Sequence, residues 1–156
     1  YYAKHVYTVR YCGTPEGALR LISSRNQNEV FSVRRDSTTR CTPDVLLQPG
    51  QRAGEVRTLA CRADGPGMGD TLPDVKVEAT FVGEESLEIG GRPRPVRHVR
   101  LRIVMKGLQA GSVVQDMWYT TDTHLLARLK TKADGSGMAR FLSDYQITLK
   151  DLRPAQ

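Results

Sequence analysis

The sequence has few of the residues and runs that mark catalytic, metal-binding or membrane-spanning proteins. It contains 3 histidines and 3 cysteines in 156 residues, with no C-x-x-C pair and no two histidines at ligand spacing, so we expect no metal site. It has no G-x-S-x-G or comparable nucleophile motif, and we therefore predict no catalytic residue and no cofactor. No uncharged stretch is long enough for a spanning helix.

Charge of one sign is not gathered at either end of the chain. Residues 1–70 carry ten Lys/Arg against seven Asp/Glu and residues 71–156 carry thirteen against ten, so each half contributes +3 to the net charge of +6. One basic patch stands out, but it lacks interleaved aromatic residues and a recognisable binding module, so we expect no nucleic-acid partner. A solvated sheet face is the first interpretation of this patch, and attraction to an anionic surface is the alternative. Its members are Arg94, Arg97, Arg100, Arg102 and Lys106.

The cysteines indicate a compartment. Cys41 and Cys61 flank a segment with Pro49-Gly50 near its middle, and proline followed by glycine is the signature of a type II turn. Such a turn brings the flanking segments together, so we predict a Cys41–Cys61 disulfide and hence an extracytoplasmic protein. Three reduced cysteines in a cytosolic domain are the alternative. Cys12 is either free or paired with a cysteine outside this sequence, and because no apolar signal region precedes Tyr1 we expect a mature or trimmed form.

The back half of the chain alternates apolar and polar residues with a period of two. This pattern predicts antiparallel strands with one buried face, because parallel strands buried on both faces would show unbroken apolar runs. Turn residues divide it into six strands, most simply a meander that curls into a half-barrel. The apolar positions that show the period most clearly are Val75, Val77, Ala79, Phe81, Val99, Leu101, Ile103, Met105, Phe141, Tyr145, Ile147 and Leu149.

The front half is less regular. Residues 4–12 alternate and predict a first strand. Thr14 suits a helix N-cap and Pro15 the first helical position, so we expect one short helix over 14–22, weakened by Gly17.

Turns and loops divide the rest of the chain. Residues 29–34 predict a short strand and 35–37 a polar turn, while the Gly/Pro-rich stretch 62–73 predicts a loop between the disulfide-tied front, 1–62, and the regular sheet, 71–150. Further turns are expected at 83–85, 90–91, 107–111, 121–124 and 134–137.

Asp116 and Trp118 lie in the most distinctive tetrapeptide, Asp-Met-Trp-Tyr. In a meander the neighbouring strands place Arg100, Arg102 and Arg128 beside them, so Asp116 neutralises arginine while Trp118 accepts a guanidinium on its ring. This is either a ladder that stabilises the sheet or an interaction surface centred on the sole tryptophan. His98 lies next to two arginines in sequence, and their charge is expected to disfavour its protonated form.

The apolar face of the sheet needs a cover, and the front half of the chain is the obvious candidate. Full coverage would leave an ordinary core. Partial coverage would leave a concave groove for an acyl chain or another hydrophobic ligand. The residues we predict to line it are Leu101, Ile103, Met117, Tyr119, Leu129 and Tyr145.

Short motifs over residues 40–150 resemble a loose class of secreted bacterial domains. Those motifs are Cys41-x-Pro43, Leu46-Leu47-x-Pro49-Gly50, Cys61, Val96-x-x-Val99-x-Leu101, Asp116-x-Trp118-Tyr119, Leu125-Leu126-Ala127-Arg128 and Tyr145-x-Ile147-x-Leu149. They are similar to envelope and lipoprotein-type domains of Gram-positive, high-GC bacteria, and the topology resembles the half-barrels of bacterial lipoprotein and lipid carriers. The resemblance implies a single curved antiparallel sheet and no catalytic signature.

These observations predict a single all-β domain of six to eight strands, a half-barrel with one short helix. The predicted function is a non-enzymatic, extracytoplasmic binding domain of the bacterial cell envelope that holds a lipid or other hydrophobic ligand. Docking of an envelope protein or an anionic surface on the basic outer face is the alternative. A hydrolase whose site is assembled from residues distant in sequence is a third hypothesis.

Overall fold

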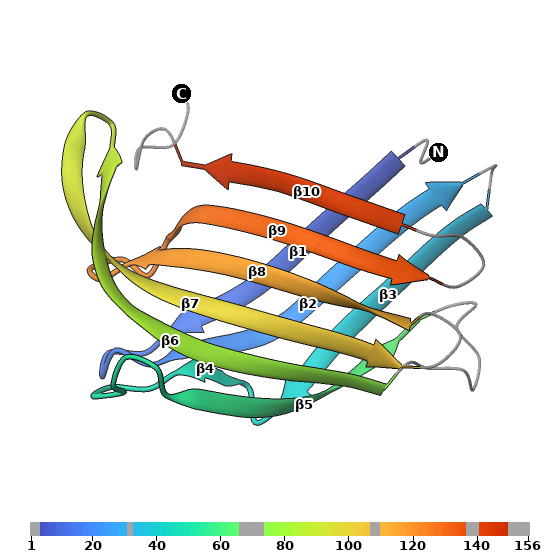
Figure 1. The fold of residues 1–156 in the computed structure, drawn as a ribbon, viewed down its shortest axis with the longest axis horizontal. Coiled ribbons are helices and arrows are strands. Elements are labelled where there is room, and N and C mark those ends of the chain that lie inside the picture. The colour runs from blue at the N-terminus through green and yellow to red at the C-terminus, as the bar shows by residue number, and fades with distance from the viewer. Residues whose placement is uncertain (1–3, 31–32, 66–73, 107–109, 137–140, 150–156) are drawn as a thin grey trace.

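The computed structural model of the chain is built from strands (Figure 1). It describes residues 4–30, 33–65, 74–106, 110–136 and 141–149. In chain order the elements are β1 (Lys4–Gly13), β2 (Leu19–Val30), β3 (Val33–Thr42), β4 (Val45–Leu47), β5 (Val56–Asp64), β6 (Asp74–Ile89), β7 (Arg92–Lys106), β8 (Ala110–Thr120), β9 (Leu126–Ser136) and β10 (Phe141–Thr148).

All ten strands belong to one antiparallel sheet. The order across it is β1-β2-β3-β5-β6-β7-β8-β9-β10, so the chain follows a meander and β4 is the single departure, pairing with the first residues of β2. The prediction of an all-β curved sheet forming a half-barrel is therefore confirmed. The sheet is larger than predicted because the front half adds strands to it.

The front half covers the apolar face by continuing the same sheet. In Figure 1, β1–β3 cross the direction of β7–β10. The rings of Tyr11 on β1 and Tyr119 on β8 meet edge to face with centroids 5.0 Å apart, and the backbone N–H of Leu126 donates to the Tyr11 hydroxyl at 2.9 Å. The two ends of the sheet thus pack face to face and enclose its concave side, which we call the inner face.

The inner face holds the main core, the inner cluster, which draws on both halves of the chain. The even spacing of apolar residues along each strand puts them on this side, where burial removes them from water. The buried members are Leu19, Leu21, Cys41, Leu46, Leu47, Leu59, Cys61, Val77, Ala79, Phe81, Val99, Leu101, Met117, Tyr119 and Leu129.

The predicted helix over 14–22 is wrong, and the described residues contain no helix. Thr14 instead begins a tight turn, in which its carbonyl accepts from the Gly17 N–H at 2.9 Å and its hydroxyl accepts from the Ala18 N–H at 3.2 Å. Gly17 has φ of 86°, a left-handed conformation that glycine adopts without a Cβ penalty. Leu19 and Leu21 are then buried while Arg20 is exposed, a strand period that outweighs the capping signals.

Two further boundaries in the front half also differ from the predictions. Of the predicted strand 29–34, residues 29–30 end β2 and 33–34 begin β3, while 31–32 lie outside the described residues. The predicted turn at 35–37 lies inside β3. Asp36 is on this strand because it faces β2, where Arg25 Nε donates to it at 2.8 Å and Gln27 Nε2 donates to it at 3.0 Å. Of the predicted loop 62–73, residues 62–64 belong to β5, and 66–73 lie outside the described residues.

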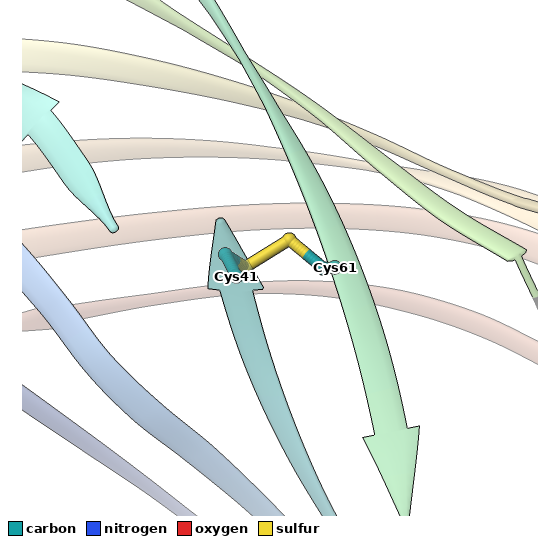
Figure 2. The surroundings of a disulfide bond; sticks show 2 residues. All are labelled: Cys41 and Cys61. Carbon is teal, nitrogen blue, oxygen red and sulfur yellow. A yellow bond between two sulfur atoms is a disulfide. The ribbon is translucent and has the colours of Figure 1, made fainter. Parts of the chain in front are cut away.

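The predicted Cys41–Cys61 disulfide is confirmed (Figure 2). The two cysteines face each other directly across β3 and β5. The predicted turn between them is also present, since Gly50 has φ of 70° and the Gln51 N–H points to the Gln48 carbonyl at 3.4 Å. Cys12 is free and exposed.

The expected turn at 83–85 is instead an irregularity within β6. The pairing with β7 shifts register between Phe81 and Gly83 and then continues to Ile89, which faces Arg92 across the turn at 90–91. Beyond the bulge the two strands turn away from the sheet at the left of Figure 1, toward the end of β10. We call this hairpin, residues 83–96, the arm.

The other expected turns are partly described. Residues 121–123 form the turn between β8 and β9. The expected turns at 107–111 and 134–137 include residues 107–109 and 137, which lie outside the described residues.

Candidate functional site

Burial on the inner face falls off along the central strands β6, β7 and β8. On β7, Val99 and Leu101 are 0 % and 3 % exposed, whereas Ile103 and Met105 are only half-buried. On β8, Met117 is 2 % exposed and Val113 is half-buried. The inner face therefore has a closely packed end and an end whose apolar side chains retain contact with solvent, which we call the open end.

The predicted ligand-binding residues divide between these two ends. Leu101, Met117, Tyr119 and Leu129 belong to the buried inner cluster, while Ile103 and Tyr145 are half-buried against it. Because the first four already contact their neighbours in the core, a bound molecule would contact Ile103 and Tyr145 first. The sequence alone could not separate the two groups, because the residues of both occupy inward-facing alternate positions of their strands.

Uncharged polar side chains cross the inner face near its open end. Tyr7 of β1 hydrogen-bonds with Ser24 of β2 and with Gln115 of β8. Gln115 is buried, and its amide also points at the Thr131 hydroxyl, 3.5 Å away. Burial raises the pKa of the Tyr7 phenol although these hydrogen bonds lower it. The residue Tyr7 is 37 % exposed, so this end of the inner face presents uncharged hydroxyl and amide groups that solvent can reach.

The outer face carries a second buried group, the outer cluster. Its buried members are Leu87, Ile89, Val96, Trp118 and Ala127, with Leu149 packed against them. Leu87, Ile89 and Val96 belong to the arm, which covers the indole so that Trp118 is only 6 % exposed. A partner approaching the outer face would therefore contact the arm before it reached the tryptophan.

A charged hydrogen-bond network lies beside this cluster, centred on His98. Its Nδ1 is 2.8 Å from Glu85 Oε1 and its Nε2 is 2.7 Å from Asp116 Oδ1. Arg100 Nε donates to the same Asp116 oxygen at 2.8 Å, and the indole N–H of Trp118 donates to Glu85 Oε2 at 3.0 Å. We call these residues the histidine network.

Stacking ties the histidine network to the outer cluster. The His98 ring lies on Trp118 with centroids 4.2 Å apart and planes 20° from parallel. Arg128 and Lys130 lie over the same indole, 5.6 and 5.8 Å from its centroid. The predicted contacts of Asp116 with arginine and of Trp118 with a guanidinium are both present.

The carboxylates of the network are held ionised. Burial raises the pKa of Asp116, but the hydrogen bonds from Arg100 and His98 outweigh it and leave that pKa below its usual range. Burial likewise raises the pKa of Glu85, and the hydrogen bonds from Trp118 and His98 reverse the sign. The sequence places His98 next to two arginines, and in the structure carboxylates also face both of its ring nitrogens.

Of the predicted interaction surface, four residues gather in one place. Arg100, Asp116, Trp118 and Arg128 lie on adjacent strands around the histidine network. Arg102 is one step along β7, where it faces Glu78 of β6. Docking through this face stays a prediction. The side chains accessible to a partner there are Arg100 and Arg102, whereas the Trp118 indole is buried.

Sequence reasoning missed two residues of this network, Glu85 and His98. Glu85 was assigned to a turn. The bulge before it also means that counting alternate positions along β6 assigns Glu85 to the wrong face of the sheet. His98 had a usable signal, because it shares the even-numbered face of β7 with Arg100, opposite Trp118 of β8.

The described part of the chain holds no cluster of three or more His, Cys, Asp or Glu side chains able to bind a metal ion. Glu85 and Asp116 sit at opposite nitrogens of one ring, so they do not converge on a common point. With both nitrogens engaged, His98 acts in this arrangement as a link between strands. Over the same residues no helix is long and apolar enough to cross a membrane.

No protein-family model, no curated protein and no solved structure matches this chain.

Proposed function

We propose that this protein is a non-enzymatic, extracytoplasmic binding domain that holds the apolar part of a lipid or similar molecule at the open end of its inner face. The fall in burial along β7 and β8 carries the proposal. Half-buried apolar side chains on an inward-facing surface are the positions where an apolar ligand removes further area from water.

The residues that would contact the ligand come from three adjacent strands. Val75 of β6 pairs with Met105 of β7, and Ile103 of β7 pairs with Val113 of β8. All four are half-buried. The uncharged groups of Tyr7 and Gln115 beside them suit hydroxyl, ester or amide groups better than a free charge, because a buried charge needs a charged partner.

The disulfide supports the proposed compartment. Cystine bonds persist outside the reducing cytosol, and this one lies within the inner cluster rather than at a reactive surface. An extracytoplasmic domain that encloses apolar side chains between two parts of one sheet is suited to keep an apolar molecule out of water.

Binding of a fluorescent fatty acid tests the proposal with two neighbouring substitutions. Val113→Trp adds bulk on the inner face, whereas Val114→Trp adds it one residue along on the outer face, where Val114 is already 36 % exposed. We expect Val113→Trp to weaken binding by about tenfold or more and Val114→Trp to leave it nearly unchanged. Equal affinities for both variants, or no binding by the wild type, would contradict the proposal.

Native mass spectrometry of protein purified without reductant gives an independent result. A bound species that is lost on denaturation identifies the class of natural ligand. A bare chain in repeated preparations, combined with a negative fatty-acid titration, would remove the lipid-binding function.

A further inference from the structure

The strands β2 and β3 turn uncharged polar side chains toward the inner face. Cys41 of β3 is buried in the inner cluster, so the alternate residues Thr39 and Ser37 share its side of the sheet. Across the ladder Thr39 pairs with Ser24 of β2, and Ser37 pairs with Asn26 in the same way. All four of these polar side chains are half-buried. We call them the polar wall.

Strand β1 connects the polar wall to the opposite side of the interior. Tyr7 of β1 pairs with Asn26. Its phenol hydrogen-bonds with Ser24 of the polar wall and with Gln115 of β8. Gln115 is two residues from half-buried Val113 on the same face of β8, so the polar wall faces the open end.

The surface across from the polar wall is apolar. Its half-buried members come from β6, β7 and β8 and are Val75, Ile103, Met105 and Val113. We call these four residues the apolar wall. Hydrocarbon in direct contact with hydroxyl and amide groups would leave those groups without hydrogen bonds. Half-burial shows that both walls instead keep contact with solvent, so a third molecule can reach them.

Neither wall carries a charged side chain. Arg57 shares the phase of Leu59 on β5, but it pairs with fully buried Ala79 and so lies toward the closely packed end. An ionised headgroup between the walls would lose water without gaining a charged partner. Ester and hydroxyl groups would find donors and acceptors on the polar wall.

We propose that the molecule held at the open end is an uncharged acyl lipid, in its simplest form an acylglycerol, whose chain lies on the apolar wall and whose ester and hydroxyl groups bind the polar wall. This inference rests on the proposed function and adds the class of headgroup to it. Serine and threonine hydroxyls and the asparagine amide both donate and accept, as glycerol oxygens require. A fatty-acid anion has the same chain but matches only the apolar wall.

Titration calorimetry tests the headgroup with two ligands that share one chain, each below its micellar concentration. One is a free fatty acid, ionised at about pH 8, and the other is its glycerol monoester. We expect the monoester to bind about tenfold more tightly. Equal or tighter binding of the anion would overturn the inference and point to Arg57 as the partner of the headgroup. Binding of neither ligand would contradict the proposed function, and the inference with it.

Two adjacent threonines separate contact with the headgroup from a general preference for less polar molecules. Thr39→Val removes a hydroxyl from the polar wall at nearly constant shape. Thr38→Val removes one from the other face of β3, where Thr38 pairs with Arg25. We expect Thr39→Val to weaken binding of the monoester by about fivefold and that of the fatty acid hardly at all, with both affinities unchanged in Thr38→Val. An unchanged monoester affinity in Thr39→Val, or an equal loss for both ligands, would overturn the inference.

A cation on the polar wall should shift the preference toward the anion. Ser37→Lys places an ammonium group there, and we expect it to strengthen binding of the fatty-acid anion by about fivefold without strengthening that of the monoester. No gain for the anion would mean that the headgroup does not approach the polar wall, which contradicts the inference. If circular dichroism shows that Ser37→Lys does not fold, the comparison of Thr39→Val with Thr38→Val decides.

Discussion

The two faces of the sheet are stabilised in different ways. The inner cluster has fifteen buried members from both halves of the chain and includes a disulfide, so its stability comes from burial and a covalent link. The outer cluster has five, joined to the sheet through charged hydrogen bonds and stacking around His98. The difference teaches that one curved sheet can combine a large apolar core with a second, smaller one that is joined to a charged hydrogen-bond network.

The largest expected effect comes from truncating one leucine in each cluster to alanine. Leu59 is fully buried on the inner face, and Leu59→Ala should lower the free energy of unfolding by about 2–5 kcal/mol, the usual cost of truncating a core leucine. Leu87→Ala in the arm should cost about 2 kcal/mol or less, because the arm can settle into the space left behind. Urea denaturation measures both, and an equal or larger cost for Leu87→Ala would show that the outer cluster is not the weaker one.

Removing the disulfide tests the covalent part of the inner cluster. It closes a loop with a sequence separation of 20, and loop-closure entropy then predicts that Cys41→Ala/Cys61→Ala lowers stability by about 3 kcal/mol. Exposed Cys12 provides the matched control, since Cys12→Ala should change stability by less than about 0.5 kcal/mol. A double variant as stable as the wild type would mean that packing around β3 and β5 holds these strands without the bond.

The inner face was largely predictable from the sequence, because alternation with a period of two survives in a simple antiparallel strand. Val77, Val99 and Leu101 all lie where the period placed them. The disulfide followed from the turn at Pro49-Gly50, whose geometry depends on two adjacent residues. Both predictions rest on local patterns that tertiary contacts leave unchanged.

The outer cluster and the connection between β1 and β2 were not predictable in the same way. Capping signals at Thr14 favoured a helix, but pairing of Leu19 and Leu21 within the sheet determined the structure. The bulge near Gly83 adds one residue to β6, so odd-numbered side chains face inward before it and outward after it. Nothing in the residue composition of this segment indicates the change. The contacts of His98 with Glu85 and Asp116 depend on that shift, which only the register of three strands reveals.

The smallest expected effect is a loss of stability in acid that arises from the histidine network. The pKa values of Glu85 and Asp116 are lowered in the folded protein, so the unfolded chain binds protons more readily near their usual range. Their contribution to stability is therefore complete above about pH 5 and is lost as the pH falls through the lowered values. Screening by solvent limits its size, because the Glu85 side chain is 42 % exposed.

Urea midpoints at about pH 6 and pH 3 compare the wild type with Glu85→Gln/Asp116→Asn, which lacks both titrations. We expect the wild type to lose more stability in acid than this double variant. Asp144→Asn serves as the control, since Asp144 pairs with Lys132 at 3.8 Å on an exposed part of β10 and its loss should leave the acid response as in the wild type. Parallel losses in the wild type and the double variant would mean that the network adds nothing to folding stability, and the arm would then be held by its apolar side chains and by the backbone contacts of Pro95 and Val96 with β8 and the turn that follows it.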